Sequence, residues 1–123
     1  MKILLDECLP KDLRKYLVGY ECGTVPGAGF SGKRNGELLA LAEHAGWQVF
    51  LTVDRGIEYQ QNLAGKVISL AVIRARSNRL AYLVPLVPGI FDALRTIKQA
   101  RYYVSADESG RRSSLIAVFE CSQ

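Results

Sequence analysis

Residues 47–53 constrain the fold of this chain more than any other segment. The run is apolar with almost no polar alternation, at Val49, Phe50, Leu51 and Val53. Such a strand is typical of the centre of a parallel sheet, where both faces are covered. Residues 67–73 repeat the pattern. The two runs therefore predict central strands of a parallel sheet.

Shorter strands and helices alternate with these runs through the first part of the chain. Strands are predicted over residues 1–5 and 21–25, and a helix over residues 11–18, directly after Pro10. Residues 55–65 are too polar for a core helix and are expected to form a short exposed one. This order indicates an α/β fold, a three-layer α/β/α sandwich with a mainly parallel sheet and right-handed crossovers.

Two further helices are predicted from their start and stop signals. Asn35 is expected to cap a helix that Gly46 ends. Residues 80–98 have a helical apolar period that Pro85 and Pro88 interrupt. Because proline cannot donate the helical hydrogen bond, we expect a kink or a restart there.

The size of the chain, 123 residues, fits a single domain. Residues 1–100 form its main part, and residues 101–123 are expected to extend it, with strand candidates at 102–104 and 115–119 that a terminal hairpin would pair. No apolar stretch approaches the ~20 residues of a membrane-spanning helix. The opening apolar run is too short for a signal peptide. We therefore expect no membrane partner and a cytoplasmic location.

The cysteines and the histidine do not form a recognisable metal or disulfide pattern. The chain has three cysteines, an odd number without a C-x-x-C pair, at Cys8, Cys22 and Cys121. This argues against a structural zinc site and a disulfide framework, and favours small buried thiols. The one histidine, His44, is expected at the surface or the end of a helix.

Three carboxylates stand at positions that favour a shared site. Asp6 and Asp54 each follow a predicted buried strand, and Glu37 lies at the start of a helix after the glycine-rich loop of residues 26–34. Ligands of an open parallel sheet bind beyond the carboxyl ends of its strands, so these acids are expected to converge. Of the neighbours Asp6 and Glu7, only Asp6 is expected to enter the cleft, because adjacent residues of an extended chain point to opposite faces.

Each acid also has an interpretation without a ligand. Asp6 with Glu7, and Glu37 on its own, would stabilise the positive start of the helix that follows. Asp54 with Arg55 would form a simple turn. If the acids do meet, three carboxylates suit magnesium or manganese, which prefer oxygen ligands and are completed by substrate phosphate. Arg55 would then balance charge or clamp a phosphate.

Other chemistries lack their parts in this sequence. No G-x-x-x-x-G-K-[ST] loop and no G-x-G-x-x-G after the first strand is present, which disfavours nucleotide hydrolysis of the P-loop kind. A second histidine and a G-x-S-x-G elbow are also missing, so serine or cysteine hydrolase chemistry is disfavoured.

A modest positive charge is compatible with a polyanionic partner. The net charge is +4, and three arginines fall within six residues, at Arg74, Arg76 and Arg79. The alternative is that these arginines are ordinary solvated side chains of a loop and a helix.

Five short segments, in this order, resemble the PIN-like family, and more narrowly its small stand-alone bacterial members related to VapC-type toxins. The similarity covers about residues 1–100. The segments are Lys2-Ile-Leu-Leu-Asp6-Glu7 with Leu9-Pro10, Asn35-Gly-Glu37-Leu-Leu-Ala, Phe50-Leu-Thr-Val-Asp54-Arg55, Tyr59-Gln-Gln-Asn-Leu63 and Arg76-Ser-Asn-Arg79.

The resemblance implies a magnesium- or manganese-dependent ribonuclease with Asp6, Glu37 and Asp54 as metal ligands. It also implies that Arg55 holds the scissile phosphate. The chain departs from the family pattern where a fourth acid usually follows the third, because that neighbourhood reads Arg55-Gly-Ile-Glu58. Contacts to single-stranded RNA would come from the polar and basic side chains of Gln60, Gln61, Asn62, Arg74, Arg76 and Arg79.

Two functions from different classes follow. The first is an endoribonuclease. The resemblance implies that it is the toxin of a toxin–antitoxin pair, in which a small antitoxin protein would cover the acidic cleft. The second is a nucleic-acid- or protein-binding module that kept the fold without strong catalysis. A phosphatase of small substrates would need a deeper pocket than short loops provide. The tail's candidate edge strands make a homodimer one further option.

Overall fold

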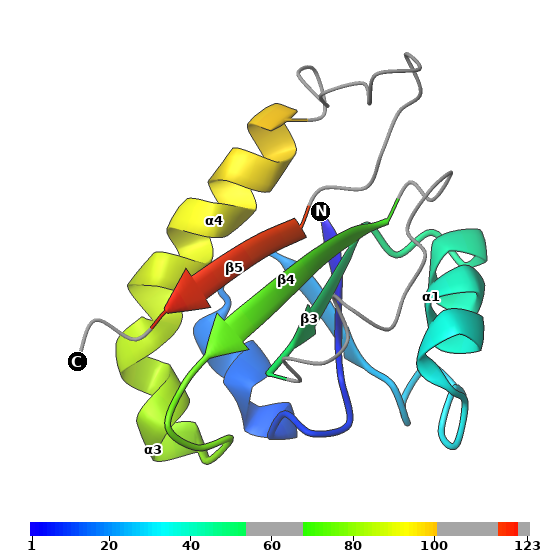
Figure 1. Ribbon diagram of the computed structural model, residues 1–123, viewed down its shortest axis with the longest axis horizontal. Helices are drawn as coiled ribbons and strands as arrows, with labels where there is room; N and C mark the ends of the chain where they lie inside the picture. Colours follow the sequence, from blue (N-terminus) through cyan, green and yellow to red (C-terminus); the bar gives the residue numbers. More distant parts are fainter. Residues whose placement is uncertain (54–67, 101–115, 121–123) are drawn as a thin grey trace.

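The computed structural model describes residues 1–53, 68–100 and 116–120, and it contains one five-stranded sheet (Figure 1). The strands lie in the order β2-β1-β3-β4-β5, and every neighbouring pair is parallel. This confirms the α/β fold with a parallel sheet. The strands are β1 (Lys2–Leu5), β2 (Glu21–Thr24), β3 (Val49–Thr52), β4 (Ser69–Arg74) and β5 (Ile116–Glu120).

The register of the sheet brings the carboxyl ends of β1, β2 and β3 to nearly the same level, while β4 and β5 extend three residues further. Leu5 of β1 pairs with Thr24 of β2 on one side and with Leu51 of β3 on the other. Leu51 in turn pairs with Ala71 of β4, and Ala71 with Ala117 of β5. One row therefore crosses the whole sheet, and the residues that follow β1 and β3 emerge next to each other.

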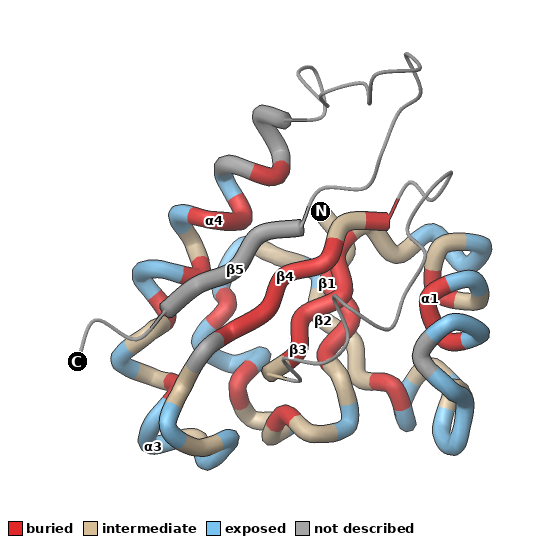
Figure 2. The backbone as a smooth tube through the Cα atoms, viewed as in Figure 1, coloured by how far each residue is buried: buried red, intermediate tan, exposed pale blue. Residues whose placement is uncertain are grey.

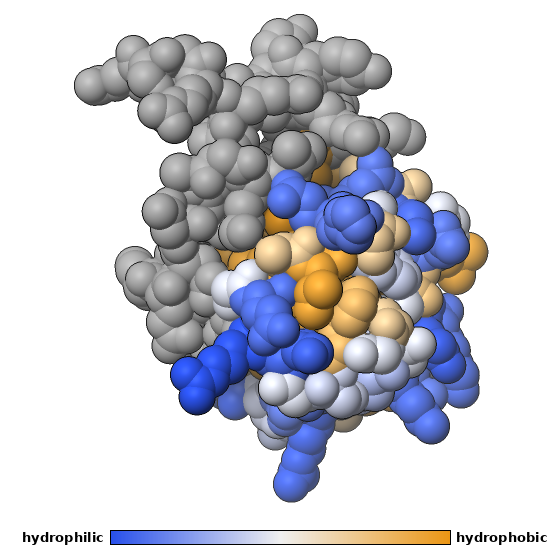
Figure 3. Space-filling view, turned by 90° about the vertical axis from the view of Figure 1, so that its right-hand side faces the viewer, coloured by the Kyte–Doolittle hydropathy of each residue, from blue (hydrophilic) through white to orange (hydrophobic). Residues whose placement is uncertain are grey.

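Helical segments pack against both faces of the sheet because successive strand residues point to opposite sides. Leu4, Phe50 and Leu70 lie in one core cluster with Leu38 and Leu39 of α1 (Asn35–His44). This is the side that Figure 3 views, where apolar residues gather near the centre among hydrophilic ones. The central strand β3 is buried along its whole length (Figure 2).

The opposite face is covered by the remaining helical segments, η1 (Lys11–Tyr16), α3 (Leu80–Leu83), η2 (Val84–Leu86) and α4 (Val87–Ala100). Ile3 and Leu5 of β1 share a core cluster there with Leu13 of η1, Leu83 of α3 and Leu94 of α4. Within residues 1–53, 68–100 and 116–120, no helix is long and apolar enough to cross a membrane.

The helices match the predicted boundaries with two corrections. The expected helix at residues 11–18 is a six-residue 3₁₀ turn, η1, which is too short for a regular helix to develop before Gly19. Arg34, and not Asn35, precedes the first turn of α1, so Asn35 is the first helical residue and not the cap. Gly46, with φ +92°, ends α1 as expected, and His44 is its exposed last residue.

The predicted interruption of the last helix is confirmed. The 3₁₀ segment η2 separates α3 from α4, and Pro85 lies within it. Pro85 and Pro88 both lack the N–H that a continuous α-helix would need at this point. The chain therefore restarts as α4 with Val87, whose apolar side packs on the sheet.

The tail contributes β5, which joins the edge of the sheet in parallel with β4. Its bounds are close to the predicted strand at residues 115–119. The other strand of the predicted hairpin, residues 102–104, lies outside the described residues, as do the expected exposed helix at residues 55–65 and Cys121.

Trp47, which lies two residues before β3, makes a close contact with β2. Trp47 lies against the backbone of Gly23, so that a β-carbon at position 23 would lie 2.9 Å from Trp47 Cζ2 and closer still to Cη2. On the same ring, Lys2 Nζ lies 4.6 Å from the centroid, a cation–π contact. Glycine is therefore required at position 23 for the indole to reach the sheet.

We predict that Gly23→Ala lowers the free energy of unfolding by about 1–3 kcal/mol, because the added methyl group overlaps the Trp47 ring. Urea denaturation followed by circular dichroism measures this. Gly89→Ala is the matched control, since position 89 in α4 has no atom within 4 Å of an added β-carbon. The control is expected to be neutral or up to about 1 kcal/mol more stable. Equal stabilities of the two variants would contradict the packing argument.

Candidate functional site

Asp6 occupies the carboxyl edge of the sheet, directly after β1. Its backbone N–H donates to the carbonyl of Leu51 at 2.9 Å, which extends the β1–β3 ladder by one step. The next residue of β3 is Thr52, so the pairing brings the side chains of Asp6 and Thr52 together. The position beyond the strand end that the sequence predicted for Asp6 is confirmed.

The carboxylate of Asp6 is held in a defined orientation by three donors. Thr52 Oγ1 donates to Oδ2 at 2.7 Å, and the Glu7 backbone N–H donates to Oδ1 at 2.7 Å. Cys8 Sγ lies 3.4 Å from Oδ2. Thr52 is fully buried, whereas Asp6 is only partly so. The site thus has an acid whose carboxylate is oriented by a hydroxyl from the neighbouring strand and by two groups of the residues that follow it.

Cys8 completes this cluster as a neutral thiol. Its sulfur lies 3.6 Å from Thr52 Oγ1. Burial, the largest effect, raises the pKa of the Cys8 thiol above its ordinary value, against smaller lowering by hydrogen bonds from the Val53 backbone and Thr52. The thiol therefore stays protonated at neutral pH and can donate to the Asp6 carboxylate.

Cys22 also carries a raised pKa. Burial raises it to about 11, against a smaller lowering by Arg14. Both Cys8 and Cys22 are free thiols and half-buried, so they are less buried than the sequence suggested.

Asn78 joins the loop after β4 to the loop after β1. Its Nδ2 donates to the carbonyl of Cys8 at 2.8 Å. In the same loop, Ser77 Oγ accepts from the Arg79 backbone N–H at 3.1 Å, which fixes the start of α3. In this segment, only the arginines were predicted to have a role, as RNA contacts. Short polar residues between a strand and a helix at this edge were the signal for a positioning role.

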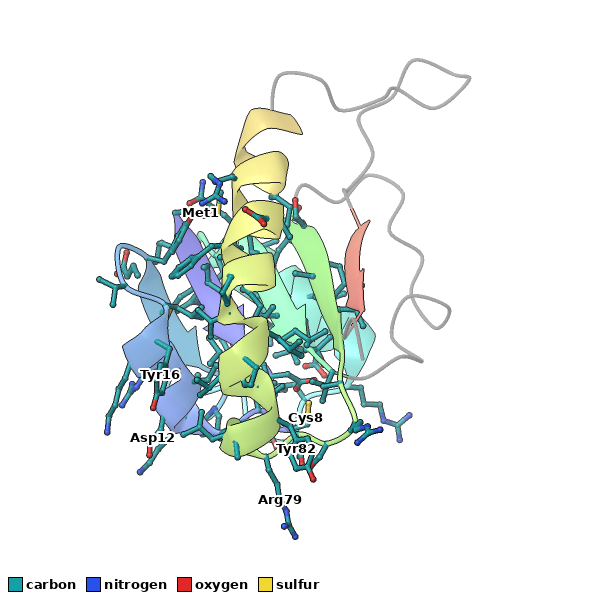
Figure 4. All side chains as sticks on the ribbon, turned by 90° about the vertical axis from the view of Figure 1, so that its left-hand side faces the viewer. Met1, Cys8, Asp12, Tyr16, Arg79 and Tyr82 are labelled. Carbon is teal, nitrogen blue, oxygen red and sulfur yellow. The ribbon has the colours of Figure 1, made fainter. Side chains whose placement is uncertain are left out.

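Two of the three predicted nucleic-acid-binding arginines are exposed in this loop. Arg76 lies on the surface, and Arg79 precedes the first turn of α3. In Figure 4, Cys8, Tyr82 and Arg79 follow one another toward the same end of the molecule. Arg74 is the last residue of β4, and its side chain lies outside the described residues. The loop therefore presents positive charge beside the carboxyl edge of the sheet.

Glu37 lies on the other face of the sheet, in the first turn of α1. Its side chain is 57% exposed, and its carboxylate pairs with Lys33 Nζ at 3.6 Å. The helix-start interpretation of Glu37 is thus compatible with its surroundings. Glu7 reaches the same segment, since its Oε1 accepts from the backbone N–H of Gly32 at 3.4 Å.

The complete three-acid cluster falls partly outside the described residues. Asp54, Arg55, Gln61 and Asn62 all lie in the segment 54–67. Among the residues that the structure describes, no group of three His, Cys, Asp or Glu side chains lies close enough to hold a metal ion. Of the predicted ligands, Asp6 and Glu37 are therefore placed individually, and their convergence with Asp54 stays a prediction.

Comparison of the chain with protein families, curated proteins and solved structures finds no match. The features that bear on function are therefore the Asp6 cluster, the loops around it and the sequence pattern.

We predict that the Thr52–Asp6 hydrogen bond stabilises the fold, since the hydroxyl is fully buried and its acceptor is charged. Thr52→Val keeps the shape of the side chain and is expected to lower the free energy of unfolding by about 1.5–3 kcal/mol. A double-mutant cycle with Asp6→Ala isolates the pair, and a coupling of at least about 1 kcal/mol is expected. Additive effects of the two substitutions would show that the bond contributes nothing.

Proposed function

We propose that this protein is a metal-dependent endoribonuclease of the PIN-like kind, which hydrolyses phosphodiester bonds in single-stranded RNA. The observation that carries the proposal is the Asp6 carboxylate, held by buried Thr52 at the carboxyl edge of a parallel sheet. Ligand sites of parallel sheets lie at this edge.

The arrangement of the fold supports the same proposal. Helical segments on both faces of the parallel sheet fit the three-layer α/β/α sandwich expected of PIN-like domains. Asp54 follows the described end of β3 by two residues, and β3 is the strand beside β1. Glu37 lies at the start of α1, whose preceding loop contacts Glu7. We propose a location in the cytoplasm, as the sequence suggested.

The donors fit magnesium or manganese in their chemistry. Asp6, Glu37 and the proposed third ligand Asp54 offer only carboxylate oxygens, which hard divalent cations prefer. Asp6 Oδ1 accepts one backbone N–H and has a second lone pair for a cation. Both side chains of the Lys33–Glu37 pair are exposed, so solvent screening keeps its contribution to the free energy of unfolding under about 1 kcal/mol. A bound cation can therefore displace Lys33 from the Glu37 carboxylate.

In the proposed mechanism, each residue has a separate task. Asp6, Glu37 and Asp54 would hold the cation, which supplies an activated water and neutralises charge on the phosphate. Thr52 keeps the Asp6 carboxylate in one orientation, and Arg55 would bind the scissile phosphate with its planar guanidinium. Arg76 and Arg79, with Arg74, Gln61 and Asn62, would position the RNA strand.

A second candidate is a binding module with weak or no catalysis. The Lys33–Glu37 ion pair favours it, because the carboxylate of Glu37 already has a partner. The sequence Arg55-Gly-Ile-Glu58, where a fourth acid is usual, points the same way. The toxin role, a small antitoxin protein and a homodimer are proposals that rest on the family resemblance.

We predict that purified protein cleaves an end-labelled, mixed-sequence RNA with Mn²⁺ or Mg²⁺, and that EDTA abolishes the cleavage. Asp6→Asn removes a metal ligand and is expected to reduce the rate at least about 100-fold while the affinity for RNA is retained. The matched control is Asp12→Asn, since Asp12 is an exposed acid of η1 that pairs with Lys15. Cleavage that persists in Asp6→Asn, or that does not need a metal, would contradict the proposal.

A further inference from the structure

We propose that Tyr82 is a base-stacking residue that binds one nucleotide of single-stranded RNA, with Arg79 and Arg76 on the adjacent phosphates. The inference deepens the proposed function, on which it rests, by naming how the RNA strand is held next to Asp6. Sequence reasoning did not assign a role to Tyr82.

Tyr82 is a large aromatic residue that the core does not bury. Its exposed fraction is 45%, and among the described residues only Tyr16 and Val18 are other large hydrophobic side chains with high exposure. The adjacent Leu83 is fully buried and attaches α3 to the core. The helix is therefore anchored by Leu83, while the adjacent Tyr82 is exposed to solvent.

Two exposed arginines, Arg76 and Arg79, precede Tyr82 in the chain. Arg79 lies three residues before Tyr82, and the Tyr82 backbone N–H donates to the Arg79 carbonyl at 2.9 Å. The first turn of α3 has no acidic residue. The segment that carries Tyr82 is therefore basic and exposed, which suits a phosphate-bearing ligand.

The position of this surface is fixed relative to Asp6. The bond from Asn78 to the Cys8 carbonyl joins the start of α3 to the loop that follows β1, and Cys8 Sγ contacts the Asp6 carboxylate. Figure 4 shows Tyr82 and Arg79 at the same end of the molecule as Cys8. A strand that stacks on Tyr82 can therefore continue toward the acid.

Single-stranded nucleic acid is the ligand that this combination of groups fits. Every base has an aromatic face that stacks on a tyrosine ring, and the linking phosphates bind arginine side chains. Tyr16 provides the contrast within the same chain. Its exposed fraction is 43% and Arg14 and Lys15 precede it on η1, so Tyr16 differs from Tyr82 in its place in the fold: the bond from Asn78 to the Cys8 carbonyl ties the Tyr82 segment to the Asp6 cluster.

The test measures binding of a 5′-labelled 12-nucleotide oligouridine by fluorescence anisotropy in EDTA, where no cleavage occurs. Tyr82→Ala is expected to raise Kd at least about fivefold, the loss of one base–aromatic stack. Tyr82→Phe retains the ring and is expected to stay within about twofold of the unmodified protein. Tyr16→Ala, the matched control, is also expected to stay within that range. Circular dichroism confirms that each variant is folded.

The salt dependence separates stacking from charge. Tyr82→Ala is expected to leave the slope of log Kd against log salt unchanged, whereas Arg79→Ala lowers its magnitude by about one phosphate contact. Equal Kd values for Tyr82→Ala and Tyr16→Ala would overturn the inference. So would a loss in Tyr82→Phe as large as in Tyr82→Ala, or binding of an acidic peptide in place of RNA.

The two proposals fail in different ways. If binding depends on Tyr82 but no metal-dependent cleavage occurs, the stacking role stands and the nuclease proposal fails. If cleavage occurs and depends on Asp6 while Tyr82→Ala binds normally, the nuclease stands and the stacking role is wrong. Absence of any RNA binding by the unmodified protein overturns the stacking role directly.

Discussion

The pairing of β1 with β3 is the constraint on which the rest of this molecule depends. Ile3, Leu4 and Leu5 align with Val49, Phe50 and Leu51, and the ladder continues into the bond from Asp6 to Leu51. Because the two strands are parallel, their carboxyl ends coincide. The same register that buries the apolar residues thereby brings a carboxylate from one strand to a hydroxyl on the next.

The hydrogen bond between Thr52 and Asp6 gives the acid a structural role in the sheet. A buried threonine hydroxyl requires an acceptor, and the Asp6 carboxylate provides one. The acid therefore stabilises the strand ends while its remaining oxygen lone pairs stay available at the surface. Asn78 extends the arrangement to the loop after β4, so that this loop, the loop after β1 and the end of β3 form one hydrogen-bonded unit.

Sequence alone predicts much of the fold because its signals are local. The apolar runs of β3 and β4, the stop at Gly46 and the restart between Pro85 and Val87 each depend on a few neighbouring residues. The 3₁₀ form of η1 and the start of α1 after Arg34 were not predicted, because a short apolar period does not distinguish a 3₁₀ segment from an α-helix and sequence signals define helix ends only to within a residue or two. The position of Asp6 followed from the end of a strand. Its partners Thr52 and Cys8, and the roles of Asn78 and Tyr82, depend on contacts between distant segments that no local pattern encodes.

The last strand of the sheet has a consequence for the folding of the chain during synthesis. β5 covers the edge of β4, but it is translated only after the whole of α3, η2 and α4. Until then the apolar strand β4 has one side without hydrogen-bonding partners, the kind of edge at which chains associate with one another. Residues 116–120 thus cover this edge of β4 only once they have been translated.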